Sequence, residues 1–145
     1  MRDIKNRTGI VHLLDPQDLV ATDTVSSILD TWGWNAAMIA VSVGALTGVD
    51  ASNHLTPILQ ESDSIEDTGF TAVAAGSVHG GFTKIDATTK DSVTQVAGYA
   101  GSKRYIRVKL DYTGAGITAG VVGVVGILGR PRVAPTTAPA PIAAT

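Results

Sequence analysis

Apolar and charged side chains alternate with a period of two between residues 101 and 112, GSKRYIRVKLDY. The apolar side chains occupy the even positions from Ile106 to Tyr112, and charged ones occupy odd positions from Lys103 to Asp111. Because successive side chains of a strand point to opposite faces, this pattern predicts a β-strand with one face in a core and one in water. The wet face raises a question, since four cations lie between Lys103 and Lys109 and need a partner.

Short apolar stretches recur along the whole chain, with turn residues between them. They are Gly9–Leu14, Thr22–Leu29, Ala36–Val43, Leu55–Gln60, Phe70–Ala74, Ser92–Tyr99, Arg104–Tyr112 and Ile117–Leu128. Strands at this spacing, in a chain with 16 glycines and few runs of strong helix formers, indicate an all-β protein. We therefore predict a single-domain antiparallel β-sandwich, jelly-roll-like, with about eight strands and extended N- and C-terminal arms.

Two local features refine the predicted strands. Pro57 lacks a backbone donor, so the strand that contains it should lie at a sheet edge or begin near there. Glycine recurs at 120, 123, 126 and 129 among Val, Ile and Leu. Apolar residues on both faces, interrupted by glycine, predict a strand that is covered on both sides and closely approached by another segment. We expect that strand to be central to the core or to an interface.

The two ends of the chain differ from the middle. Four of the six prolines lie in the C-terminal sequence GRPRVAPTTAPAPIAAT, which has no periodicity. We predict an N-terminal arm over 1–8, a β-sandwich domain over 9–129 and a Pro/Ala-rich C-terminal arm over 130–145. The C-terminal arm is interpreted either as a disordered tail or as a segment that lies across a neighbouring subunit.

Composition limits the possible classes of protein. The 145 residues suffice for one domain with a real core, and the absence of cysteine excludes disulfides, thiolate zinc sites and cysteine nucleophiles. No apolar signal-peptide core follows the charged first residues, and the longest apolar run, 115–128, is too short to span a bilayer. We expect a soluble protein with no membrane partner, kept in the cytoplasm until it is used.

The charges are distributed unevenly although the net charge is only −2. No Lys or Arg lies between Thr8 and Phe82, a stretch with nine acids, whereas Lys84 and the residues after it hold eight cations and three acids. Either folding interleaves the two halves and cancels their fields, or the surface is bipolar and suited to docking.

A search for catalytic chemistry finds no convincing pattern. The G-x-G-x-x-A spacing at 114–119 lacks the following helix and acid of a dinucleotide site, so a turn between strands is the better interpretation. His12, His54 and His79 have no metal-ligand spacing, and His79 should lie in a flexible turn. The acidic segment QESDSIED lacks the spacing of a calcium loop and is predicted to be a solvated hairpin tip. We expect no enzyme, and no catalytic, cofactor-binding or metal-binding residue.

Nucleic acid is a weak candidate for the partner of the basic strand. Tyr105 shares its face with Lys103, Arg107 and Lys109, as in single-strand binders. The chain is nevertheless net acidic, with a pI near 5.8, and has no nucleic-acid-binding signature. We therefore expect no nucleic acid.

Four segments follow one another in a recognisable order: ILDTWGWNAAMIAVSVGALTG, LTPILQESDSIEDTGFTAVAA, GYAGSKRYIRVKLDYTG and GVVGVVGILGRPRVAP. Together they resemble one known family, the head decoration or cement proteins of tailed bacteriophages, and the resemblance covers residues 9 to 135. It implies a β-sandwich on the outer surface of the capsid, commonly a trimer at three-fold positions, assembled in the host cytoplasm. The implied partners are the major capsid protein and copies of the chain itself.

The predicted interface consists of the cations and their neighbours in both arms and in the basic strand. These residues are Arg2, Lys5, Arg7, Lys103, Tyr105, Arg107, Lys109, Arg130, Pro131 and Arg132. We expect Lys103, Arg107 and Lys109 to face acidic protein, either a neighbouring copy or the capsid protein. Two alternatives stay open: a tail or head–tail joining component, and a carbohydrate-binding module that uses Trp32 and Trp34 on one strand face.

Overall fold

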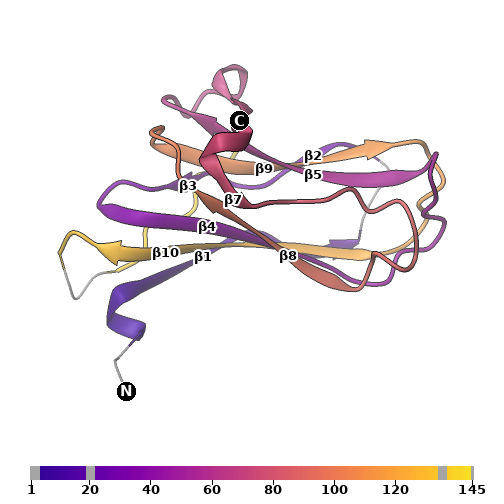
Figure 1. Cartoon of the computed structure of the whole chain (residues 1–145), viewed down its shortest axis with the longest axis horizontal. Coiled ribbons are helices and arrows are strands. Elements are labelled where there is room, and N and C mark those ends of the chain that lie inside the picture. Colours follow the sequence, from indigo (N-terminus) through magenta and orange to yellow (C-terminus); the bar gives the residue numbers. More distant parts are fainter. Residues whose placement is uncertain (1–3, 19–21, 134–136, 145) are drawn as a thin grey trace.

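The computed structural model describes residues 4–18, 22–133 and 137–144, and in these ranges the chain forms two antiparallel sheets packed face to face (Figure 1). The first sheet has the order β1 (Thr8–Asp18), β10 (Val121–Pro131), β4 (Trp34–Val43), β8 (Val93–Tyr99) and β7 (Val78–Gly80). The second has the order β2 (Thr24–Val25), β9 (Tyr105–Thr113), β5 (His54–Ser62) and β6 (Thr71–Ala72), with β3 (Leu29–Asp30) also paired to β9. The described regular structure outside the sheets is three short 3₁₀ turns, η1 (Lys5–Arg7), η2 (Asp67–Gly69) and η3 (Ala75–Ser77).

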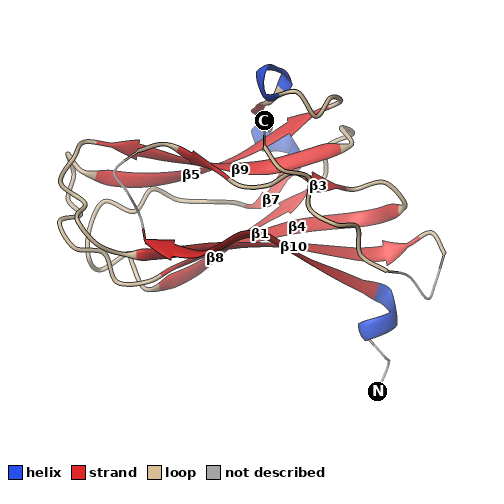
Figure 2. Ribbon diagram, turned by 180° about the vertical axis from the view of Figure 1, so that it is seen from behind, coloured by secondary structure: helices blue, strands red, loops and turns tan. Residues whose placement is uncertain are grey.

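The path of the chain is that of a jelly roll. The chain passes from β1 in the first sheet to β2 and β3 in the second, back to β4, across to β5 and β6, and back to β7 and β8. It then crosses to β9 and returns to β10 in the middle of the first sheet (Figure 2). The predicted stretch Thr22–Leu29 forms two short strands, β2 and β3, and β7 lies outside every predicted stretch, so the described ranges hold ten strands where about eight were expected. The predicted all-β, single-domain sandwich is confirmed.

The core lies between the sheets and is apolar on both sides. The first sheet contributes Ile39, Val41, Val124 and Leu128, and the second contributes Leu55, Ile106, Val108 and Leu110. The last three are the even positions of the alternating segment, as predicted. Burial of each such side chain contributes about 1.5–3 kcal/mol, which makes the interior the main source of stability.

Gly126 shows why β10 needs glycine. A Cβ atom at this position would lie 2.8 Å from Leu29 Cδ2 and 3.1 Å from Leu13 Cδ1. The missing side chain therefore lets Leu29 of the second sheet reach the first sheet. β10 pairs with β1 on one side and β4 on the other, so its predicted central position is confirmed.

Pro57 lies where the outer side of β5 has no neighbour. β9 pairs with β5 from His54 to Ser62, whereas β6 pairs only with Gln60 and Glu61. The backbone of Leu55 bonds to Ile85, away from β9, and Pro57 has the same parity. The missing N–H of Pro57 therefore costs no ladder bond, in line with the predicted edge position.

The segments predicted as arms are partly integrated into the sandwich. β10 continues through Arg130 to Pro131, and β1 begins at Thr8. After residues 134–136, the C-terminal segment returns to its own chain, where Ile28 and Ile142 exchange two backbone hydrogen bonds of 2.7 and 3.0 Å. Ala138 packs against the core, so the 137–144 segment is docked on its own domain.

No helix in the described ranges is long and apolar enough to cross a membrane.

Candidate interaction surface

The cations in β9 and in the loop directly before it form ion pairs with acids of the same chain. Lys109 Nζ lies 2.8 Å from both Asp23 Oδ2 and Asp111 Oδ1, and Lys103 forms an ion pair with Asp63. Hydrogen bonds to these carboxylates raise the pKa of both lysines. Asp23 and Asp63 belong to the acidic N-terminal half, so folding interleaves the two halves here and cancels much of their charge.

Arg107 is buried, contrary to its predicted place on a wet face. Only 4% of the residue is exposed, because the turn after β5 folds over it. Its guanidinium carbon lies 4.1 Å from the centroid of the Phe70 ring, its Nε donates to Gln60 Oε1 at 2.9 Å, and it forms an ion pair with Asp67. The acidic segment expected to be a solvated tip is therefore fastened to β9 at Asp67.

Tyr99, the last residue of β8, links the end of β5 to the loop before β9. Its hydroxyl donates to Glu61 Oε2 at 2.5 Å and accepts from the backbone N–H of Lys103 at 2.8 Å. Burial, followed by the hydrogen bond to Glu61, raises the pKa of Tyr99. This network fixes the start of the basic strand.

The remaining predicted interface residues lie at one end of the sandwich, except Arg2, which is outside the described residues. Lys5 and Arg7 form η1, while Arg130 and Pro131 end β10. Arg130 is exposed and adopts a positive φ of 54°, and the guanidinium of Arg104 lies 4.9 Å from the ring centroid of Tyr105. The predicted set is thus divided between the second sheet and one end of the first.

The two tryptophans do not share a strand face, because Gly33 makes a turn between them with a φ of +86°. Trp34 begins β4 and is buried, whereas Trp32 is 67% exposed. Trp32 borders a groove of about 310 Å³ that also includes Tyr99, Arg104 and Arg132. The guanidinium carbons of Arg104 and Arg132 lie 5.2 and 5.7 Å from the Trp32 ring centroid, and Arg104 also pairs with Asp30. The expectation that the two tryptophans share one strand face is therefore wrong, although Trp34 also lines this groove.

The centre of the outer face of the first sheet is apolar, a feature of which the sequence indicated only the part in β10. The strand register places two rows there, Ile10, Ile127, Met38 and Gly98 in one, and His12, Val125, Ala40 and Val96 in the next, and a row with the polar Ser42 and Thr94 follows. Ile10 is 70% exposed, Val96 42% and Met38 37%. We call the eight residues of the first two rows the apolar face. It contains no Asp, Glu, Lys or Arg.

A depression of about 760 Å³ extends from the apolar face toward the end of the sheet. It is lined by residues that include Ile4, Thr8, Met38, His79, Ile127 and Arg130. His79 is in β7 here, not in a flexible turn. Ile4, just before η1, is 73% exposed and adds a further apolar side chain to this surface.

The second sheet presents the opposite kind of outer face. Register pairs Lys109 with Ile58, Asp111 with Thr56 and Arg107 with Gln60. Its charged groups are neutralised within the chain by the ion pairs described above. The sandwich is therefore asymmetric: one outer face is polar and its charges are paired within the chain, while the apolar centre of the other is covered by none of the segments that the structure describes.

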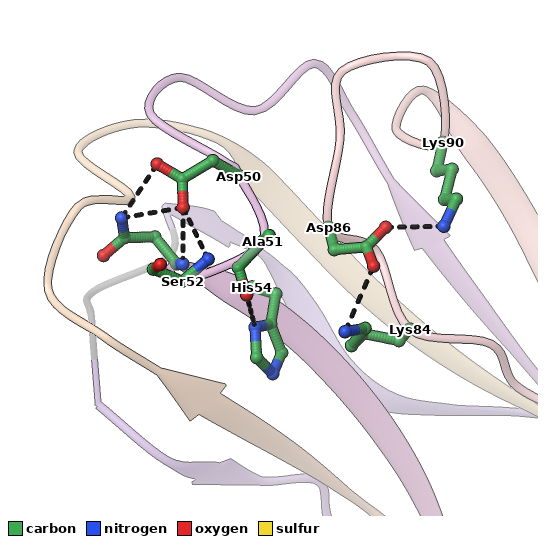
Figure 3. Close-up of polar contacts among 8 residues, drawn as sticks. Asp50, Ala51, Ser52, His54, Lys84, Asp86 and Lys90 are labelled. Atoms are coloured by element: carbon green, nitrogen blue, oxygen red, sulfur yellow. Dashed lines mark hydrogen bonds and ion pairs between the residues drawn. The ribbon is translucent and has the colours of Figure 1, made fainter.

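Loops at the other end of the sandwich are fixed by local polar contacts (Figure 3). The side-chain amide of Asn53 donates to both carboxylate oxygens of Asp50 at 3.0 Å, and the backbone N–H groups of Ser52 and Asn53 donate to it at 2.7 and 2.8 Å; these hydrogen bonds lower the pKa of Asp50. Asp86 lies between Lys90 and Lys84, and their hydrogen bonds lower its pKa to about 2. These two carboxylates therefore stabilise the conformation of their own loops. Within the described ranges, no group of three or more His, Cys, Asp or Glu side chains gathers as metal ligands.

Comparison with known proteins yields no family. No family model matches the chain, and no curated protein matches it. Among solved structures, it is similar to a chain of the disulfide-linked pili of Bacillus endospore appendages, with 16% identity and a TM-score of 0.38 over 90% of this chain and 96% of that one. The Clostridium thermocellum xylanase 10B CBM22-1–GH10 modules give 15% identity and a TM-score of 0.41 over 86% of this chain and 25% of theirs. A family two carbohydrate esterase from Cellvibrio japonicus gives 12% identity and a TM-score of 0.36 over 91% and 36% of the two chains.

Proposed function

We propose that this chain is a structural protein of a tailed-phage head, which binds the outside of the capsid and stabilises the shell without catalysing a reaction. The sequence resemblance over residues 9–135 suggests the role, and the apolar face is the observation that carries it. In this proposal the chain is assembled in the host cytoplasm, acts in many copies, as trimers in the arrangement that the resemblance implies, and has the major capsid protein as its partner.

The physical support comes from the cost of leaving the apolar face in water. A row such as Ile10, Ile127 and Met38 gains about 25 cal/mol for each Å² that a partner covers. The charged groups on the other outer face are already paired within the chain. A rigid sandwich with one such apolar face is therefore suited to binding a protein rather than a small ligand. Many modest contacts on a symmetric shell then act together, so that avidity replaces a single tight pocket.

Quantitative mass spectrometry of purified virions tests the proposed function. The measured quantity is the number of copies of this chain relative to the major capsid protein. A ratio near one copy per capsid subunit supports shell decoration. A few copies per particle would contradict it and favour a tail or head–tail joining component, and absence from the particle would overturn the structural role altogether.

A carbohydrate-binding surface module is a second candidate, favoured by the exposed ring of Trp32 beside its groove. Tryptophan faces suit sugar rings, although Arg104 and Arg132 already lie over this ring. The test is binding of the purified chain to immobilised bacterial surface polysaccharides. This candidate predicts binding that is lost in Trp32→Ala and kept in Ile65→Ala, a control at another exposed apolar residue. No binding by the unaltered chain would exclude it for the polysaccharides on the panel.

A further inference from the structure

The apolar face is bounded by opposite charges at its two ends. β1 runs the length of the face from Thr8 to Asp18, a span of about 30 Å at roughly 3.3 Å per residue. Arginines lie beyond its beginning and aspartates at its end. Between them, the two apolar rows contain no Asp, Glu, Lys or Arg.

The positive end is formed by Arg7 and Arg130. Thr8 pairs with Gly129, and Arg7 directly precedes the one while Arg130 directly follows the other, so both arginines belong to the same end of the sheet. Both arginines are exposed, and neither forms an ion pair with a residue in the described ranges. They are therefore unlike the cations of β9, which are matched to acids of their own chain.

The negative end is formed by Asp15 and Asp18. Asp18 pairs with Val121, which has the parity of Val125 and Ile127, so Asp18 lies on the side of the apolar face. It forms no ion pair with a described residue, and the described nitrogen that pairs with Asp15 is His12 Nδ1, at 2.8 Å. Both aspartates are exposed.

We propose that the apolar face is covered by a second copy of this chain, with Arg7 and Arg130 of each copy against Asp15 and Asp18 of another. The face carries both members of the charge pair at opposite ends, so it is complementary to itself when a second face is laid against it with the strands reversed. Stacked sheets pack about 10 Å apart, close enough for the two apolar rows to interdigitate. Closure around a three-fold axis, with the Arg end of each copy at the Asp end of the next, satisfies the same charges.

This inference names the partner of the face on which the proposed function rests, but its test needs only the purified full-length chain. Sedimentation velocity over a concentration series should show a particle of two or three chains. Replacing exposed apolar residues, Ile10→Asp together with Val96→Asp, should shift the equilibrium toward the single chain by at least tenfold. Ile65→Asp, at an exposed residue of the β5–β6 turn, is the matched control and should associate like the unaltered chain.

Charge exchange tests the orientation of the copies. Arg7→Glu with Arg130→Glu, and separately Asp15→Lys with Asp18→Lys, should each weaken self-association several-fold at low salt, because like charges then meet. Mixing the two variants should restore association, since the charges are again opposite wherever a copy with two acidic ends meets a copy with two basic ends. Lys84→Glu with Lys90→Glu reverses two cations of the loop around Asp86 and serves as the control for altered net charge.

The outcomes separate this inference from the proposed function. A single chain at all concentrations, or association that is indifferent to the Ile10 and Val96 changes, overturns the inference even if virions contain the chain at capsid stoichiometry. Self-association that is disrupted by the face variants and restored by mixing upholds it even if virions lack the chain. Circular dichroism of every variant must match that of the unaltered protein, and variants that fail this check are replaced by Ile10→Ser and Val96→Thr, for which a weaker loss of association is expected.

Discussion

The guanidinium carbon of Arg107 lies 4.1 Å from the centroid of the Phe70 ring, beneath the turn that follows β5. Arg107 comes from β9 and Phe70 follows η2, so the contact fastens a long acidic turn to the centre of the second sheet. The same guanidinium bonds to Gln60 and pairs with Asp67. Arg107 thus holds the turn after β5 against β9, and little of its guanidinium is accessible to an external partner.

Replacing Arg107 by alanine should lower the free energy of unfolding by about 2 kcal/mol, because a stacked cation, a hydrogen bond and an ion pair are lost together. Urea denaturation followed by tryptophan fluorescence measures the change. Lys90→Ala removes an exposed ion pair with Asp86 and should cost much less. An equal decrease in the free energy of unfolding in the two variants would contradict the role of Arg107 in holding the turn against β9.

A side chain at Gly126 should disturb the contact between the sheets. The Cβ of Gly126→Ala would lie 2.8 Å from Leu29 Cδ2, and the overpacking should cost about 1–3 kcal/mol. In the double variant Gly126→Ala with Leu29→Ala, the two changes should cost less than their sum, since the space is then vacated. Gly76→Ala, where no atom lies within 4 Å of the new Cβ, is the control and should change stability by at most about 0.5 kcal/mol. Strict additivity at Gly126 and Leu29 would contradict the close approach.

The carboxyl group of Asp86 should titrate with a pKa of about 2 in the folded chain, because hydrogen bonds from Lys90 and Lys84 favour its charged form. The folded pKa is depressed below the unfolded value, so this group's contribution to stability is present above the unfolded pKa, near 4, and is lost as the pH falls toward 2. Carbonyl chemical shifts across a pH series report the midpoint. In Lys84→Ala with Lys90→Ala the midpoint should rise toward the ordinary value, and an unmoved midpoint would show that the lysines are not its cause.

Deleting residues 137–145 should leave a folded sandwich with a free energy of unfolding lower by about 1–3 kcal/mol, since two backbone hydrogen bonds to Ile28 and the packing of Ala138 are lost. Thermal unfolding measures the difference. Ile142→Ala keeps the backbone bonds and should lose only part of this stability. Unchanged stability in the deletion would mean that the docked segment contributes nothing in solution.

The fold class could be predicted from patterns that are local in the sequence, whereas the exposure and contacts of individual surface residues could not. Alternation between 101 and 112 suffices to place Ile106, Val108 and Leu110 in a core, because the period of a strand is fixed by its backbone. The burial of Arg107 depends on Phe70 and Asp67, which lie far away in sequence and meet it only through the sheet pairing. The turn at Gly33, which separates the two tryptophans, likewise has no alternating pattern to reveal it.

The part of the apolar face that belongs to β10 could be predicted from the sequence. Val, Ile and glycine on both sides of β10 predicted a strand covered on both faces, in the core or at an interface. The inner side is covered by residues such as Leu29, whereas no segment in the described ranges packs over the outer side, with Val125 and Ile127. A single sequence does not state that the neighbouring positions are Ile10 and Met38, because that requires the register of three strands.

The two backbone hydrogen bonds between Ile28 and Ile142 determine on which side of the sandwich a peptide or protein fused to the C-terminus would lie. The last described residues lie against the second sheet, while η1 leads in beside the first (Figures 1 and 2). A peptide or enzyme fused after the C-terminus would be held on the polar side of the sandwich, whereas one fused before the N-terminus would begin next to the apolar face. If the chain is used to display a fused protein on a particle, fusion to the N-terminus and fusion to the C-terminus would therefore present that protein on opposite sides of the sandwich.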